Sequence, residues 1–152
     1  MKRHHAAAVI FAAAVAFCTC SLGARAAEPL ATVGGAVAPA LHGKPLIVRV
    51  HADWCGECQT SLPDFLTFTK TYRGKINVVD IDVTDGKTAA IARARAERAG
   101  LAPYYERTKA TPLTVAFINP NSNTVYAALR GNVTLSQLVS AEKAVEASLQ
   151  GR

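Results

Sequence analysis

The stretch LIVRVHADWCGEC, residues 46–58, holds the features that decide the fold of this chain. Residues 46–51 form a run rich in β-branched side chains, which predicts a buried strand. The run ends in Ala52-Asp53-Trp54 and brings Cys55 to the start of a predicted helix. We therefore expect an α/β domain with a cysteine pair at a strand–helix junction.

The chain after this stretch continues the alternation. Leu62, Phe65, Leu66 and Thr69 recur at helical spacing, with Pro63 inside the helix. A second strand is predicted at 76–83, and an Ala-rich helix at 87–99 follows it. After a loop at 101–109 come a strand at 113–118, its hairpin partner at 124–129, and a final helix opened by the capping pattern at 134–137. The predicted order is β-α-β-α-β-β-α.

The first 26 residues have the pattern of a secretory signal. A basic start at 1–5 precedes an apolar run at 6–17, and Ala24-Arg25-Ala26 places small residues where a signal peptidase cuts. The alternative is an uncleaved membrane anchor, for which the apolar run is short. We predict a signal peptide at 1–26, an N-terminal lead-in at 27–45 and one domain at 46–150, exported to the periplasm.

Export changes what the composition implies. The whole chain of 152 residues has 17 Lys+Arg, 11 Asp+Glu and four cysteines, for a net charge of +6. Removal of Lys2, Arg3 and Arg25 leaves 14 basic and 11 acidic groups, a net charge of +3. A charge this small is no evidence for nucleic-acid binding. Cys18 and Cys20 leave with the signal, so that one CxxC pair remains.

The pair Cys55-Gly56-Glu57-Cys58 suits redox chemistry better than a structural role. A disulfide across three residues removes little entropy from the unfolded chain, so it would stabilise the fold poorly. A zinc site needs four ligands, and His42 and His51 are badly spaced to complete one. Three alternatives remain: a structural disulfide, two ligands of a metal site, and a cysteine pair with no function.

The residues around the pair resemble the thioredoxin family. Residues 52–58 are similar to its active-site segment, Pro63 matches the proline five residues after the second cysteine, and 72–75 match the helix exit. The similarity runs without a gap from Val48 to Asp82 and resumes at Thr111-Pro112, which resembles the family's cis-proline. It covers roughly two thirds of the chain after the signal. The resemblance implies a thioredoxin fold, with a central mixed sheet flanked by helices.

The resemblance also implies roles for the site residues. Cys55 would be the nucleophile, activated at a helix N-terminus, and Cys58 the buried resolving thiol, with a disulfide between them. Trp54, Gly56 and Glu57 would support the site. A cis bond at Pro112 would hold the backbone of Thr111 against the cysteines to bind an extended substrate; a trans turn proline is the alternative.

The chain departs from the family pattern at Arg49 and Asp80. The family usually has a buried acid at the position of Arg49 and a lysine at that of Asp80, so the two charges are exchanged here. We expect the two to form a buried pair beneath the active site, because an unpaired buried arginine costs too much; otherwise Arg49 points to solvent. With such a pair, Cys58 lacks its usual acidic proton acceptor.

Two further departures concern Glu57 and the segment before Pro112. Glu57 replaces the middle proline common between the cysteines, and an acid there disfavours the thiolate, which favours a reductase; an inert surface carboxylate is the alternative. The segment from Asp82 to Pro112 is about a dozen residues longer than in a minimal thioredoxin. The enlargement lies in the helix at 87–99 and the loop at 101–109.

The expected function is thiol–disulfide exchange with protein thiols and disulfides. The sequence favours a reductase or electron relay, with a membrane-embedded thiol donor as one partner. A disulfide oxidase or isomerase, and a redox-inert binding module on the same fold, remain alternatives. We expect a monomer that needs no organic cofactor and no metal.

Overall fold

The computed structural model describes residues 30–151. The predicted signal peptide at 1–26 lies outside these residues. Among the residues described, no helix is both long and apolar enough to span a lipid bilayer.

One mixed sheet forms the centre of the described part of the molecule. Its strand order is β1-β5-β4-β2-β3; β2 and β3 run parallel, and the other neighbours run antiparallel. The strands are β1 (Ala31–Thr32), β2 (Leu46–His51), β3 (Asn77–Asp82), β4 (Thr114–Asn119) and β5 (Thr124–Arg130). This is the expected α/β thioredoxin fold.

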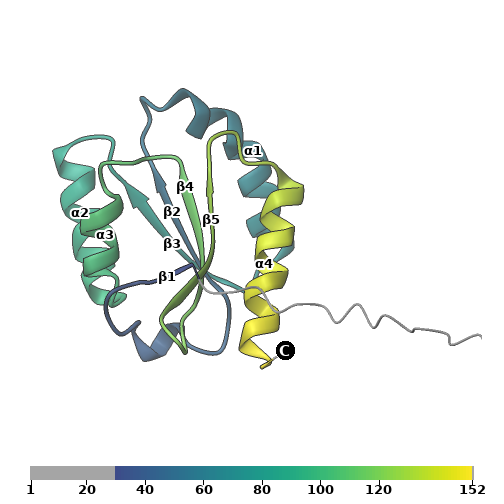
Figure 1. Ribbon diagram of the computed structural model, residues 1–152. Coiled ribbons are helices and arrows are strands. Elements are labelled where there is room, and N and C mark those ends of the chain that lie inside the picture. Colours follow the sequence, from purple (N-terminus) through teal and green to yellow (C-terminus); the bar gives the residue numbers. More distant parts are fainter. Residues whose placement is uncertain (1–29, 152) are drawn as a thin grey trace, which may run out of the picture.

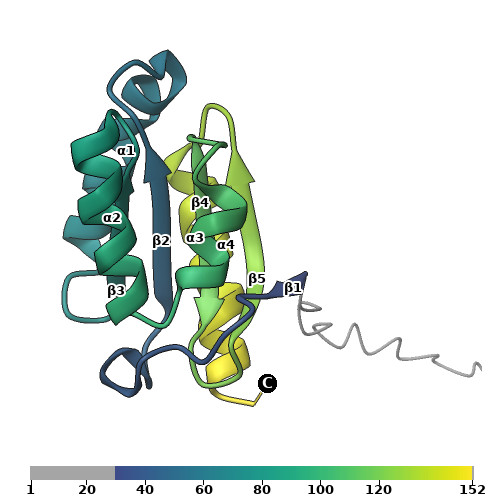
Figure 2. The ribbon, with the colours of Figure 1, turned by 90° about the vertical axis from the view of Figure 1, so that its left-hand side faces the viewer.

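Helices cover both faces of the sheet, as Figure 1 shows. On one face lie α2 (Gly86–Arg98) and α3 (Ala102–Thr108), which stand in front of the sheet in Figure 2. On the other lie α1 (Gly56–Thr71) and α4 (Leu135–Leu149). Each face has its own buried apolar cluster, and the side chains of the strands alternate between the two.

The alternation along β2 decides where its charged residue lies. Leu46, Val48 and Val50 belong to the cluster under α2 and α3, whereas Ile47 belongs to the cluster under α1 and α4. Arg49 therefore points to the α1 side, where its guanidinium lies 4.9 Å from the centre of the Phe65 ring. The parallel register pairs Arg49 with Asp80 of β3, so both side chains leave the sheet on the same face.

The segment predicted as a loop at 101–109 is mostly the helix α3. Pro103 occupies its first turn, where a missing N–H costs nothing, and Tyr104 and Tyr105 are buried in the core. The hydroxyl of Tyr105 donates to the carbonyl of Ala89 in α2 at 3.0 Å. Burial of two aromatic rings holds this short helix in place.

The residues before β2 are also part of the fold. A short 3-10 helix at Pro39–Leu41 follows β1, which pairs with β5 at the far edge of the sheet. Val33 and Val37, between them, lie in the core. The domain core thus includes side chains from the segment that the sequence predicted as a lead-in.

Candidate active site

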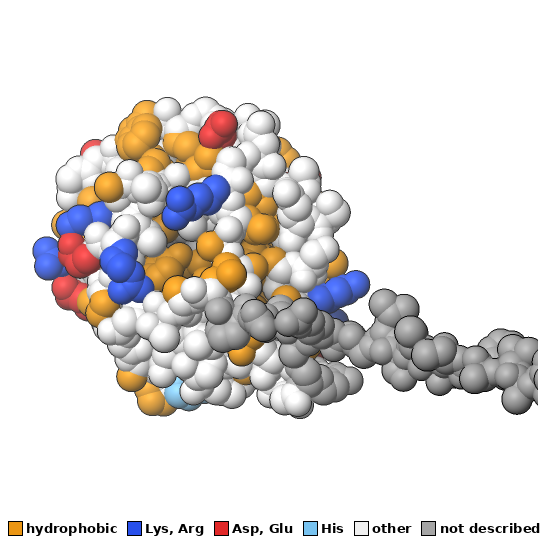
Figure 3. Space-filling view, in the orientation of Figure 1, with side chains coloured by type: hydrophobic (Ala, Val, Ile, Leu, Met, Phe, Trp, Pro, Cys, Tyr) orange, Lys and Arg blue, Asp and Glu red, His pale blue; other side chains and the backbone are white. Residues whose placement is uncertain are grey.

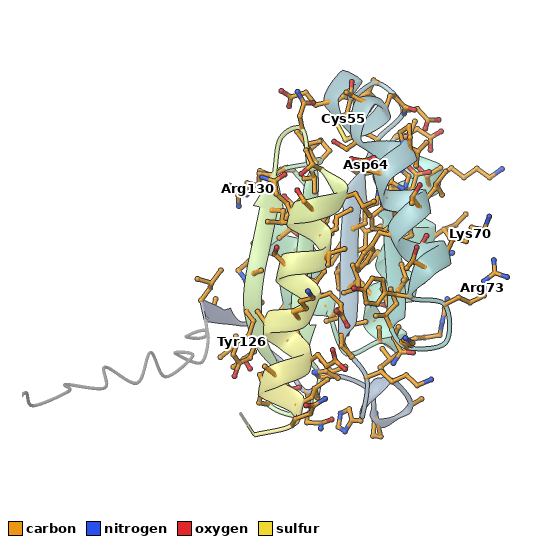
Figure 4. The ribbon with its side chains drawn as sticks, turned by 90° about the vertical axis from the view of Figure 1, so that its right-hand side faces the viewer. Cys55, Asp64, Lys70, Arg73, Tyr126 and Arg130 are labelled. Atoms are coloured by element: carbon orange, nitrogen blue, oxygen red, sulfur yellow. A yellow bond between two sulfur atoms is a disulfide. The ribbon has the colours of Figure 1, made fainter. Side chains whose placement is uncertain are left out.

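The two cysteines lie at the carboxyl end of β2, where α1 begins. Cys55 is the N-cap of α1 and Cys58 lies in its first turn. They form a disulfide with a Cα–Cα distance of 5.2 Å, visible as the yellow bond at one end of the molecule in Figure 4. Cys55 thus lies at the start of the helix that follows β2, and Cys58 lies one helical turn further along the chain.

The environments of the two sulfur atoms differ. Cys55 is half-buried, whereas Cys58 is 3% exposed. The backbone N–H of Cys58 donates to Sγ of Cys55 at 3.2 Å, so that a free amide of the first helical turn already points at this sulfur. A helix N-terminus favours negative charge, and Cys55 is therefore placed to react as a thiolate.

The loop between β2 and α1 is held by Thr84, which follows β3. The Thr84 hydroxyl accepts the Asp53 N–H at 2.9 Å, and its carbonyl accepts the indole N–H of Trp54 at 3.0 Å. The amide and hydroxyl of Thr84 both donate to the carboxylate of Asp82. Burial favours a higher pKa for Asp82, but these two bonds and the nearby charges of His51 and Arg49 together outweigh it and hold the pKa below its ordinary value.

The residues that surround the pair face solvent. Trp54 is 65% exposed and touches the fold through its indole N–H, so it is not a core aromatic. Gly56 and Glu57 are exposed as well. On the face shown in Figure 3, basic side chains lie beside acidic ones over α2 and α3 rather than in one basic surface.

A small cavity lies beneath Cys58. Its volume is about 20 Å³, close to the space that one water molecule occupies. Cys58, Arg49, Ser61 and apolar side chains line it. The Ser61 hydroxyl accepts the Val133 N–H at 2.9 Å, which ties α1 to the loop before α4. Arg49 is the single charged residue among those that line this cavity.

Arg49 and Asp80 form an ion pair, and Arg49 is the less exposed of the two. Nη1 of Arg49 lies 3.8 Å from Oδ1 of Asp80, and the side chains are 11% and 40% exposed, respectively. The other carboxylate oxygen, Oδ2, lies 3.2 Å from Nε2 of His51. Because β3 is the edge strand, Asp80 reaches solvent while Arg49 stays under α1.

The prediction of a cis peptide bond before Pro112 is wrong. Among the described residues there is no cis peptide bond, and Thr111 is exposed while Pro112 is half-buried. The chain makes its turn into β4 at Leu113, whose φ is 76°, and the Leu113 N–H donates to the Val50 carbonyl at 2.8 Å. Leu113 also lines the cavity beneath Cys58.

The sequence reasoning missed four residues of this region. Thr84 and Asp82 position the loop, while Ser61 and Leu113 line the cavity. The pattern Asp-x-Thr at the end of a strand is a turn signal that could have pointed to the first two. A positive φ at a leucine has no sequence signal, because glycine and asparagine are the residues that usually adopt it. In residues 30–151 no cluster of three or more His, Cys, Asp or Glu side chains is placed to hold a metal ion.

Known proteins are similar to this region in sequence, and others are similar in fold. The thioredoxin family model matches residues 37–94. A thiol:disulfide interchange protein TxlA homolog from Synechocystis sp. is 37% identical over 46 residues, 30% of this chain and 26% of that protein. A thioredoxin H-type from Chlamydomonas reinhardtii is 39% identical over 51 residues, 34% of this chain and 43% of that protein. The chain thus spans less than half the length of each of these two relatives.

Among solved structures, a DsbF homologue from Corynebacterium diphtheriae superposes with a TM-score of 0.50 and 16% identity. The match covers 69% of this chain and 74% of that one. At this identity the likeness concerns the fold alone. The disulfide at the start of α1, the sheet order and the matched residues 37–94 lead to one conclusion: this chain contains a thioredoxin domain with the thioredoxin fold.

Proposed function

We propose that this chain is an exported protein-disulfide oxidoreductase that exchanges its dithiol with the disulfides of other proteins. The observation that carries the proposal is the Cys55–Cys58 disulfide at the N-terminus of α1, with Cys55 half-buried and Cys58 buried. One accessible sulfur and one protected sulfur in the same helical turn are what a two-step exchange requires.

In the reducing direction, the Cys55 thiolate attacks a substrate disulfide. A bond forms between Cys55 and one substrate sulfur, the substrate S–S bond breaks, and the other sulfur leaves as a thiolate that takes a proton from water. The Cys58 thiol then gives its proton to water and attacks Sγ of Cys55, which expels the second substrate sulfur as a thiolate that also takes a proton from water. The substrate gains two electrons and two protons, and the protein is left with the Cys55–Cys58 disulfide.

We favour a reductase or electron relay in the periplasm. Glu57 lies between the cysteines and is exposed, and an acid beside the thiols favours the disulfide form of the protein. In an oxidising compartment the resulting disulfide would be reduced again by a membrane-embedded thiol donor.

The basic start and apolar run of residues 1–26 support export. The mass of the secreted chain tests this, because its N-terminus is expected at Ala27.

A disulfide oxidase or isomerase is the second candidate, favoured by Arg49. A cation beside a buried thiol favours the reduced protein, and therefore a more oxidising site. The reduction potential separates the two candidates. A value near about −270 mV supports the reductase, and one near about −120 mV supports the oxidase. Equilibration with a glutathione buffer measures it.

Trapping tests whether the site reacts with proteins at all. The Cys58→Ser variant should stop at the mixed disulfide, because the group that resolves it is gone, and Cys55 should stay bound to its protein partners. Cys55→Ser is the matched control, which keeps one thiol but removes the accessible one. Reducible adducts with Cys58→Ser and none with Cys55→Ser are expected in cell-envelope extracts. Adducts with neither variant would favour a redox-inert binding module.

A further inference from the structure

We infer that Arg49 acts as a positioning charge for the exchange reaction: it stabilises the thiolate of Cys58 from below, in a place where the protein offers no acid to accept the proton. The inference rests on the proposed function, because it assigns a role to Arg49 in the second step of that reaction. The residue itself touches no substrate.

The first support is the place of Arg49 in the fold. Its side chain leaves β2 on the α1 side, packs over the Phe65 ring at 4.9 Å, and lines the same small cavity as Cys58. The Arg49 side chain is 11% exposed. A charge held this far from bulk water acts through a lower dielectric, so its effect on a neighbouring sulfur is larger than at the surface.

The second support is that Arg49 is incompletely neutralised. Its carboxylate partner, Oδ1 of Asp80, lies at 3.8 Å, which is too long for a hydrogen bond. Among the described residues this same oxygen, although buried, has no hydrogen-bond partner. The other oxygen of Asp80 is engaged by His51. The carboxylate is thus shared, and it sits at the exposed edge of the sheet.

Apart from Arg49, the residues that line the cavity with Cys58 carry no positive charge. From β4 and from the α4 side come the apolar side chains of Leu113, Val115, Val133 and Leu138. Besides Asp80 and Asp82 of β3, the nearby acids are Asp53 and Glu57, which are exposed, and Asp64, whose Oδ2 accepts the Leu135 N–H at 2.8 Å. Figure 4 shows Asp64 on α1 near the cysteine end of the molecule. These carboxylates and burial oppose the thiolate, whereas Arg49 favours it.

The consequence for the reaction concerns the proton of Cys58. Before Cys58 attacks the mixed disulfide, its thiol must give this proton to water, since no carboxylate lines the cavity to accept it. The cavity of about 20 Å³ that Arg49 and Cys58 both line has room for one water molecule. In the disulfide form Cys58 carries no charge. Arg49 therefore stabilises only the reduced, ionised protein, and it makes the site a better acceptor of electrons.

The ionisation of Cys58 tests the inference directly. In a Cys55→Ser background, the NMR chemical shift of the Cys58 β-carbon reports the thiolate fraction against pH. Arg49→Met, which keeps the packing on Phe65, should disfavour the thiolate about tenfold, that is, raise the titration midpoint by about one pH unit. Asp80→Asn should lower the midpoint, because it frees the guanidinium from its anion. Arg49→Lys should stay close to the parent.

Opposite shifts from Arg49→Met and Asp80→Asn are the expected result, and a purely structural role would not produce them. Equal midpoints in both, or shifts in the same direction, would overturn the inference. Arg73→Met is the matched control: it removes the same charge from a position just beyond the far end of α1 (Figure 4) and should leave the midpoint unchanged. If Arg49→Met does not fold, Arg49→Lys and Asp80→Asn still decide the question.

The reduction potential gives the second measurement and separates the two proposals. At a pH above the midpoint of Cys58, Arg49→Met should shift the equilibrium with glutathione about tenfold toward the disulfide, about 30 mV. If the parent protein never equilibrates with glutathione, the proposed function fails while the titration of Cys58 still stands. If the parent equilibrates and Arg49→Met matches it, only the role of Arg49 fails.

Discussion

Thr84 shows how a single residue can hold an active-site loop from outside the motif. It binds the backbone of Asp53 and the indole of Trp54, and it is itself fixed by Asp82. The cysteines could be found from the sequence because CxxC after a strand is a local pattern. Thr84 could not, because it lies 29 residues after Cys55 along the chain and only the pairing of β2 with β3 brings the two ends together.

Replacing Thr84 should loosen this loop. In Thr84→Val the Asp53 N–H loses its acceptor and Asp82 loses one donor, so we expect the free energy of unfolding to fall by about 1–3 kcal/mol. Urea unfolding followed by the fluorescence of Trp54, the single tryptophan of the chain, measures the change. The control is Thr67→Val, whose exposed hydroxyl donates to a carbonyl of its own helix. An equal loss in both variants would contradict a special role for Thr84.

In the helix α1, the periodic pattern of apolar residues does not decide which face of the helix is buried. Leu66, one of the residues that recur at helical spacing, is 56% exposed, whereas Phe68 is fully buried. Phe65, Phe68 and Tyr72 form the stripe that packs inward, spaced three and four residues apart. With apolar residues at 62, 65, 66 and 68, two stripes fit helical spacing about equally well. The packing of α4 selects one of them.

The contact of α4 with α1 buries a carboxyl group. Glu142 is 3% exposed, and its Oε2 has no hydrogen-bond partner among the described residues. Burial raises the pKa of Glu142 above its ordinary value of 4.5, and the charge of Glu146 adds to the shift. Because the folded carboxyl holds its proton more tightly than the unfolded one, its stabilising contribution is complete below pH 4.5 and is lost as the pH rises through the folded value.

Neutralising Glu142 should therefore stabilise the protein near neutral pH. We expect Glu142→Gln to raise Tm by roughly 2–5 °C at pH 7 and to lose this advantage below pH 4.5. Thermal unfolding across the pH range measures the difference. Glu97→Gln, on the exposed face of α2, should show no comparable gain at any pH. An advantage that does not depend on pH would mean that the charge of Glu142 is not the cause.

At the scale of the whole molecule, the segment before β2 closes the face formed by α2 and α3. The Ala38 N–H donates to the Ala99 carbonyl at 2.9 Å, and Val33 and Val37 complete the core there. Gly100 makes the close approach possible. Its φ is 73°, and a Cβ atom on it would lie 2.0 Å from the carbonyl oxygen of Ala36.

Gly100→Ala should consequently separate this segment from the domain. The added methyl group meets backbone rather than a flexible side chain, so we expect a loss of about 2–4 kcal/mol in the free energy of unfolding. Gly43→Ala is the matched control, since Gly43 has φ 80° but nothing within 4 Å of its Cβ position. It should lose only the backbone strain of about 1–2 kcal/mol. Equal losses in urea unfolding would show that strain, and not the contact, limits both sites.

The sequence by itself determined the local parts of this protein: the strand–helix junction with its two cysteines, the order of most elements, and the exchange of charges at Arg49 and Asp80. These follow from periodicity and short motifs, which act within a few residues. Only the tertiary structure decided which half of the ion pair is less exposed, that α3 is a helix, and that Leu113 rather than a cis-proline turns the chain beneath Cys58. The reason is physical. Burial and electrostatic environment depend on neighbours that are distant along the chain, and the sheet brings those neighbours together.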